Sequence, residues 1–150
     1  MKVDTSVAAS GVLSQARFFS ALDKAQLARV AALGEARSFQ ADTRIYTVGD
    51  AVDHFYVLGE GMVRFTLGLS KRDTSAGDII HRGDVFGWAA LVEGHSKRIA
   101  TAYCLTACEV LALDGRALTR LMESDATIGF GVMKKLAVLL SSELVALAAG

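Results

Sequence analysis

Cysteine is scarce and proline is absent in this 150-residue chain. Its two cysteines, Cys104 and Cys108, are too few for a disulfide framework and supply only half of a four-ligand metal site. We interpret both as small core residues, and the alternative interpretation is a redox-sensing pair. Proline is absent altogether, and this absence points to no particular function.

Net charge and long apolar runs are missing as well. The 16 lysines and arginines balance 16 aspartates and glutamates, so no overall field draws the chain to nucleic acid or to an anionic membrane. The N-terminus lacks the basic and apolar regions of a secretory signal. The most apolar run, residues 136–149, is shorter than the ~20 residues that span a bilayer. We therefore expect a soluble, cytoplasmic protein.

Short apolar segments separated by glycine or aspartate dominate residues 35–114. This pattern predicts a single domain, residues 1–150, of mainly β class, in which an antiparallel β-roll or jelly roll carries flanking helices. An apolar fraction of 52% is enough to build its core. The predicted strands are 36–39, 44–48, 55–58, 62–69, 78–81, 85–86, 99–105 and 109–113.

Helical patterns flank the β region on both sides. Residues 1–17 are predicted to form an N-terminal extension, of which residues 1–10 are frayed. Ser20 is the predicted N-cap of a helix that stops at Gly34. After a turn-rich segment at 115–122, Asp125 is placed to cap a long helix that fills residues 125–150.

The long C-terminal helix has more apolar surface than one neighbour can cover. Met133, Leu140 and Leu147 repeat every seven residues, and further apolar side chains widen the stripe. We expect one side to pack on the β-roll and the other on the same helix of a second subunit, which makes a homodimer. The alternative is that the helix folds wholly onto its own domain.

One segment inside the β region combines the features of a phosphate-binding site. Residues 83–91 predict a strand, a glycine turn and a short helical turn, and Arg98 follows after a polar loop. The free N–H groups at a helix start, placed opposite a guanidinium, can hold a phosphate.

The order of these elements resembles the cyclic nucleotide-binding domain of the catabolite-activator (Crp/Fnr-like) superfamily, over residues 18–147. The motifs that carry the resemblance are Phe-Ser-Ala-Leu at 19–22, Ile-Tyr-Thr-Val-Gly-Asp at 45–50, Phe-Tyr-Val-Leu-Gly-Glu-Gly at 55–61, Gly-Asp-Val-Phe-Gly at 83–87 and the strand opened by Arg98. The resemblance implies a regulatory module that is not an enzyme. Transcriptional members carry a helix-turn-helix after the long helix, and none follows here, so we expect a stand-alone module without direct nucleic-acid binding.

The resemblance also implies where a ligand binds. The cyclic phosphate of cyclic AMP or cyclic GMP would lie between Gly87 and Arg98, with the backbone N–H groups of Trp88, Ala89 and Ala90 facing the anion. No cofactor or metal is implied. In relatives the C-terminal helix closes over the base, and the residues here in the corresponding region are Ser141 and Ser142. An alternative for the arginine is an ion pair with a carboxylate such as Glu93.

Two positions depart from the family pattern. Trp88 stands where a glutamate usually accepts a hydrogen bond from the ribose, and Ile99 stands where a serine or threonine usually touches the phosphate. Thr101, two residues along the predicted strand, would offer a hydroxyl on the same face as Ile99. A hydrogen bond to a charged group is worth roughly 1.5–3 kcal/mol, so each loss weakens binding by about tenfold to a hundredfold.

Three functions remain open at this point. The first is a regulatory module that senses a small anionic ligand, binds it weakly or in an altered way, and signals to an unknown downstream protein. The second is a degenerate, ligand-independent domain for dimerisation or scaffolding, in which Trp88 and Ile99 fill the former pocket. The third and most remote is a cupin-type metalloenzyme, although His54, His81 and His95 are dispersed in the sequence.

Overall fold

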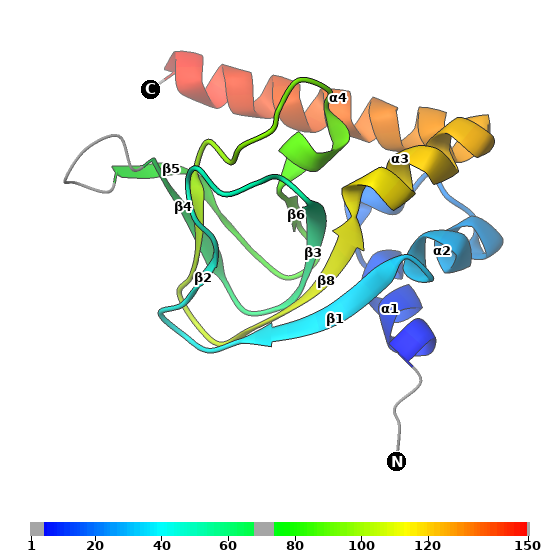
Figure 1. Ribbon diagram of the computed structural model, residues 1–150, viewed down its shortest axis with the longest axis horizontal. Coiled ribbons are helices and arrows are strands. Elements are labelled where there is room, and N and C mark those ends of the chain that lie inside the picture. The colour runs from blue at the N-terminus through cyan, green and yellow to red at the C-terminus, as the bar shows by residue number, and fades with distance from the viewer. Residues whose placement is uncertain (1–4, 68–73, 150) are drawn as a thin grey trace.

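The computed structural model describes residues 5–67 and 74–149. Within these residues, eight strands form two four-stranded antiparallel sheets that face each other, with helices on their flanks (Figure 1). This architecture confirms the predicted β-roll with flanking helices. The elements in chain order are α1 (Thr5–Ser14), η1 (Arg17–Phe19), α2 (Lys24–Ala31), β1 (Gly34–Phe39), β2 (Arg44–Tyr46), β3 (His54–Glu60), β4 (Val63–Leu67), β5 (Thr74–Ile80), β6 (Val85–Phe86), η2 (Trp88–Leu91), β7 (Thr101–Cys104), β8 (Cys108–Asp114), α3 (Gly115–Ser124) and α4 (Ala126–Ala149).

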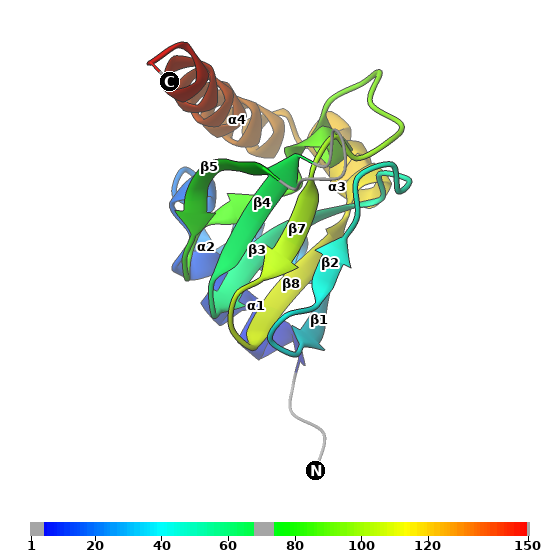
Figure 2. The same cartoon turned by 90° about the vertical axis from the view of Figure 1, so that its left-hand side faces the viewer.

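The two sheets interleave strands that are far apart in the sequence. One sheet has the order β1-β8-β3-β6 and the other the order β2-β7-β4-β5 (Figure 2). Each predicted strand corresponds to an observed one, with bounds that differ by a few residues. The predicted strand 99–105 begins only at Thr101, and residues 68–69 of the predicted strand 62–69 lie outside the described residues.

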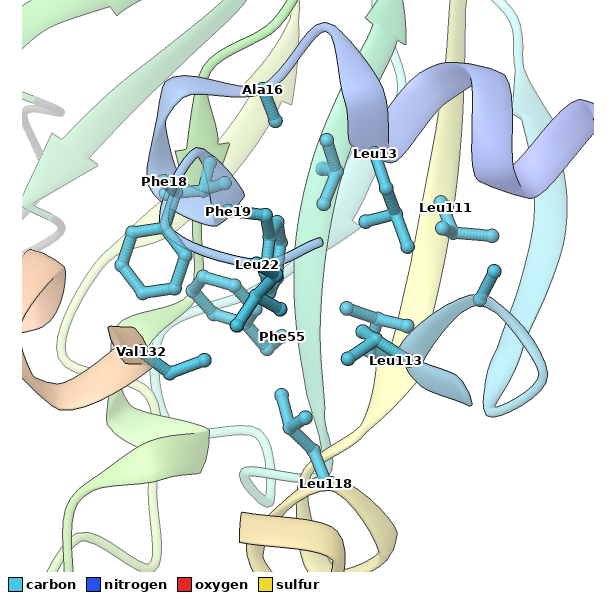
Figure 3. Packing of buried hydrophobic residues seen from close by; sticks show 14 of the residues in the cluster. Leu13, Ala16, Phe18, Phe19, Leu22, Phe55, Leu111, Leu113, Leu118 and Val132 are labelled. Atoms are coloured by element: carbon cyan, nitrogen blue, oxygen red, sulfur yellow. The ribbon is translucent and has the colours of Figure 1, made fainter. Parts of the chain in front are cut away.

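Two hydrophobic clusters hold this arrangement together. The larger one joins the N-terminal helices, the outer side of the β1-β8-β3-β6 sheet and α4. Figure 3 shows Phe18, Phe19 and Phe55 close together in it, and the ring centroids of Phe18 and Phe55 are 5.0 Å apart. The second cluster fills the space between the sheets and includes Tyr56, Phe86, Cys104 and Cys108. Burial of both cysteines as free thiols agrees with their interpretation as core residues.

Two expectations for the N-terminal region are wrong. Residues 5–10 are not frayed but belong to α1, whose Leu13 is fully buried in the larger cluster. Ser20 is not an N-cap, because α2 starts three residues later at a capping box formed by Asp23 and Gln26. The Asp23 carboxylate accepts from the Gln26 amide at 2.8 Å, and the Gln26 side chain accepts from the Asp23 amide at 2.9 Å.

The predicted cap of the long helix is confirmed. The Asp125 carboxylate accepts hydrogen bonds from the amides of Thr127 and Ile128, and it pairs with Arg29 at 2.6 Å. These contacts fix the start of α4, which then passes over the β-roll (Figure 1). Among the described residues, no helix is both long enough and apolar enough to cross a membrane.

Candidate functional site

The segment that joins β6 to Arg98 is the cassette, defined as residues 87–98. Gly87 opens it with φ 79° and ψ 34°, a left-handed conformation that favours glycine. A side chain here would also meet close neighbours, because a Cβ would lie 3.1 Å from the Tyr56 ring and 3.2 Å from both the Arg98 guanidinium and the His54 carbonyl oxygen. The glycine therefore lets the cassette backbone approach both the arginine and β3.

Arg98 is buried at the centre of this site, with 2% of its side chain exposed. Its Nη1 donates to the Gly87 carbonyl at 3.2 Å, and its Nη2 donates to the His54 carbonyl at 2.5 Å. Nη2 also lies 3.8 Å from a carboxylate oxygen of Asp53. The carboxylate beside Arg98 therefore belongs to Asp53. The alternative expectation, in which Glu93 supplies this carboxylate, is wrong. The Arg98 Nε is buried with no hydrogen-bond partner in the described part of the chain.

An aromatic stack lies beneath the guanidinium. The Arg98 Cζ is 4.2 Å from the centroid of the Tyr46 ring, within cation–π distance. Tyr46 stacks on Tyr56 at 5.9 Å, and Tyr56 stacks on Phe86 at 5.1 Å with 12° between the ring planes. Burial raises the pKa of Tyr46 strongly, and the positive charge of Arg98 offsets only part of that rise. Tyr46 therefore stays neutral, so the stack presents polarisable faces rather than charge.

Asp53 and His54 complete the polar surroundings; sequence reasoning missed Asp53 and considered His54 only as one of three dispersed histidines. The Nδ1 of His54 lies 3.0 Å from the Asp53 carboxylate. Partial burial acts to raise the pKa of Asp53, but hydrogen bonding and charge interaction with His54, together with Arg98, lower it below its ordinary value. The carboxylate is thus ionised beside the guanidinium. Asp53 precedes β3 by one residue, and only the folding of β3 against the cassette brings it to Arg98, more than forty residues later.

The backbone N–H groups of the cassette are only partly available to an anion. Ala90 donates its amide to the Gly87 carbonyl at 3.2 Å, which closes the helical turn, so the expectation that this amide faces an anion is wrong. The amides of Trp88 and Ala89 have no hydrogen-bond partner within the residues that the structure describes. These two amides therefore remain available as hydrogen-bond donors once the helical turn has formed.

The residues after Arg98 do not alternate as a strand. The chain bends at Ile99 and Ala100, so Ile99 is 57% exposed whereas Thr101 is buried. The Thr101 hydroxyl accepts a hydrogen bond from the Val48 amide at 2.9 Å. The expectation that Thr101 shares a face with Ile99 is therefore wrong, and its hydroxyl instead holds the loop that follows β2.

Trp88 lies on the helical side of the site. Its indole packs against the larger hydrophobic cluster, whereas Tyr46, Tyr56 and Phe86 belong to the cluster between the sheets. The ring of His95 meets the indole edge-on, with centroids 5.4 Å apart. Further along α4, Ser141 and Ser142 are exposed.

The three histidines stand apart in the fold. His54 lies on β3, His81 follows β5, and His95 lies in the loop after η2. Within residues 5–67 and 74–149, no three histidine, cysteine, aspartate or glutamate side chains gather closely enough to hold a metal ion.

Comparisons with known proteins bear on the whole of this arrangement. The sequence model described as cyclic nucleotide-binding domain matches residues 36–125, more than half of the chain. The cGMP-dependent protein kinase, isozyme 1, of Drosophila melanogaster is 33% identical over 104 residues. That match covers 67% of this chain but only 13% of the kinase.

Solved structures share the fold along nearly the whole chain. A protein from Geobacter metallireducens described as cyclic nucleotide-binding has a TM-score of 0.76 at 20% identity, over 95% of this chain and 99% of that one. The sensor domain of the transcriptional regulator DNR from Pseudomonas aeruginosa has a TM-score of 0.77 at 16% identity, with 95% of each chain covered. The regulatory domain of Toxoplasma gondii PKA, crystallised with cAMP, has a TM-score of 0.73 at 22% identity, over 89% of this chain and 50% of that one.

Proposed function

The chain belongs to the cyclic nucleotide-binding domain family, and from this premise we propose that it is a regulatory module that senses a small anionic ligand. Cyclic AMP and cyclic GMP are the first candidates. Arg98 binds the anionic group, and the amides of Trp88 and Ala89 contribute the remaining donors. The module binds and signals without catalysis, and it requires no resident metal or cofactor.

One observation carries the proposal. Arg98 is buried, its Nε has no partner in the described part of the chain, and its other donors contact two carbonyls and one carboxylate. Buried polar groups in folded proteins are almost always hydrogen-bonded, so an unpaired guanidinium donor favours an acceptor from outside the chain. A phosphate is the acceptor that the planar geometry of arginine fits best.

Signalling would proceed through α4. The helix runs above the short turn of η2 (Figure 1), and an anionic ligand at Arg98 would lie between the aromatic stack and the helix. For the ligand to signal, α4 needs two packing states that the ligand binds with different affinity. The exposed Ser141 and Ser142 are the candidate base contacts on the helix, and an unknown downstream protein would respond to its position.

Isothermal titration with cyclic AMP and with cyclic GMP tests the proposal. The informative variant is Arg98→Lys, which keeps the charge but loses the planar fork, and we expect it to weaken binding by about tenfold or more. Arg116→Lys, at an exposed position on α3, is the matched control and should bind like the wild type. Absence of heat with both nucleotides at millimolar concentration would reject the proposed ligand class.

A second function is favoured by the contacts that Arg98 already makes within the chain. Arg98 already contacts Gly87, His54 and Asp53, and it stacks on Tyr46. A ligand-independent domain for dimerisation or scaffolding would need no more than this. Its signature is a melting temperature that stays constant when either nucleotide is added, because a ligand that binds only the folded state must raise it.

Both candidate functions, the ligand-sensing module and the ligand-independent domain, include dimerisation through α4. The outer face of the helix leaves Phe130, Met133, Val138 and Leu144 exposed by 71%, 40%, 60% and 67%. Phe130 and Leu144 are fourteen residues apart, two heptads along the helix, which is the spacing of a helix–helix seam. We expect a dimer in analytical ultracentrifugation, and Phe130→Asp combined with Leu144→Asp should make it a monomer. Thr127→Asp, exposed near the start of α4, is the control.

A further inference from the structure

Trp88 is the only tryptophan of the chain, and its surroundings go beyond the proposed anion site. It is the first residue of η2, directly after the left-handed Gly87. Its partly buried indole packs against the larger hydrophobic cluster, to which α4 contributes Ile128, Val132 and Leu136. In Figure 1 the short turn of η2 lies beneath α4. The side chain therefore lies on the side of the cassette that meets the helix.

The face of α4 that points to the core continues toward the C-terminus at the same spacing. Leu139 and Leu140 pack against the same cluster as Leu136, and Glu143 follows Leu139 by four residues and Leu140 by three. Glu143 is exposed; desolvation raises the pKa of its carboxyl, and interaction with the Trp88 side chain offsets part of that rise, which places the carboxyl near the indole. The core-facing stripe of α4 thus runs to Leu140 and ends one turn before Glu143.

A second group holds the indole from the cassette side. His95 lies in the loop after η2, and its ring stands edge-on to the indole at 5.4 Å and 80°. An edge-to-face pair of this kind fixes ring orientation better than simple apolar contact does. Trp88 is therefore held by its own cassette on one side and by the larger hydrophobic cluster on the other.

We propose that Trp88 is the docking residue of the α4 lid, so that the helix closes on the cassette through the indole in the absence of any ligand. A tryptophan buries 150–250 Å² when it is fully covered, an apolar area comparable to that of a nucleotide base. At the position where the family has a ribose-binding glutamate, this chain supplies a built-in apolar platform for the helix. This inference does not depend on the proposed function, because lid closure can be measured without a ligand.

Amide hydrogen exchange of the ligand-free chain tests the inference. In Trp88→Ala, the amides at 139–144 should exchange about tenfold faster or more, because the end of α4 opens locally, while the amides of β3 and β8 keep their protection. Ile99→Ala, directly after the cassette, is the matched control, since Ile99 is 57% exposed and packs little. Trp88→Phe should restore part of the protection. Equal exchange at 139–144 in Trp88→Ala and in the wild type would refute the docking role.

A second measurement decides the matter even if Trp88→Ala fails to fold. The fluorescence of the single tryptophan shows how well other residues cover its indole, because acrylamide quenches an exposed indole faster than a covered one. Leu139→Ala should raise the quenching constant of Trp88 about twofold, and Val138→Ala, which alters the neighbouring residue that is 60% exposed, should leave it unchanged. The same quenching constant in all three proteins would show that α4 does not cover the indole.

Discussion

The two ends of the cassette are held by opposite kinds of interaction. At one end, Arg98 is buried among polar groups: the carbonyls of Gly87 and His54 and the carboxylate of Asp53. At the other end, Trp88 is held by an apolar cluster and the edge of His95. The comparison shows that directional polar contacts fix Arg98, whereas apolar packing and one aromatic edge fix Trp88.

The polar end depends on precise backbone positions, and the apolar end does not. Carbonyl oxygens at fixed points satisfy a buried charge only while the backbone stays in place, and an unpaired buried group costs roughly 1–3 kcal/mol. Apolar contact at Trp88 tolerates small shifts because it has no directional requirement. We therefore expect substitutions at the polar end to affect the whole fold and substitutions at Trp88 to affect mainly α4.

The largest effect is expected from Arg98→Ala. It removes a buried guanidinium, leaves two carbonyls without their donor and opens space above Tyr46, so the free energy of unfolding should fall by about 3–4 kcal/mol. Urea denaturation followed by circular dichroism measures this change. Arg116→Ala, on the exposed surface of α3, should cost less than about 0.5 kcal/mol. A loss below about 1 kcal/mol for Arg98→Ala would contradict a structural role of the polar end.

A matched pair of glycines tests how tightly the polar end is packed. Gly87 and Gly94 both have a positive φ, 79° and 90°, so alanine at either position carries a backbone cost of about 1–2 kcal/mol. Only at Gly87 would the new Cβ also meet Tyr56, Arg98 and the His54 carbonyl, since nothing lies within 4 Å at Gly94. Gly87→Ala should therefore destabilise by about 1 kcal/mol more than Gly94→Ala. Equal melting temperatures for the two variants would mean that the residues around Gly87 make room for the new Cβ without an energetic cost.

Local signals in the sequence predicted the fold well. Glycine and aspartate breaks between short apolar segments marked all eight strands, and Asp125 marked the start of α4. The same kind of signal failed at Ser20, because Asp23 with Gln26 forms a stronger capping box three residues later. It failed again at residues 5–10, whose small side chains gave no sign that Leu13, further along the same helix, is fully buried against the sheet.

The site itself was predicted only in part. Gly87 and Arg98 carry family motifs that can be recognised locally, but the surroundings of Arg98 come from β2 and the start of β3. No pattern in the sequence links Asp53 or Tyr46 to a residue more than forty positions away. The bend at Ile99 could not be predicted from the sequence either, because an apolar residue followed by alternating apolar and polar residues predicts a continuous strand.

A smaller effect, and a gain rather than a loss, is expected from Ile99→Ser. The side chain is exposed, so the free energy of unfolding should change by less than about 0.5 kcal/mol. A hydroxyl beside Arg98 would restore one hydrogen bond to a bound phosphate, which should strengthen binding of cyclic AMP or cyclic GMP by about tenfold. Isothermal titration measures the gain, and Ile99→Ala should show none. An unchanged affinity in Ile99→Ser would place the anion away from the start of this bend.

The smallest effect concerns the carboxylate at the polar end. Because interaction with His54 and Arg98 keeps the pKa of Asp53 below its ordinary value of 3.8, the ionised form stabilises the fold at neutral pH. That contribution is lost as the pH falls through 3.8 and below, where the folded chain must also take up the proton. Asp53 is 63% exposed, so Asp53→Asn should cost only about 0.5 kcal/mol at pH 7, and the difference from the wild type should vanish in acid. Glu93→Gln removes an exposed carboxylate from the cassette loop and serves as the control, with no such pH-dependent difference expected. A difference between wild type and Asp53→Asn that persists in acid would mean that Asp53 acts through packing rather than through its charge beside Arg98.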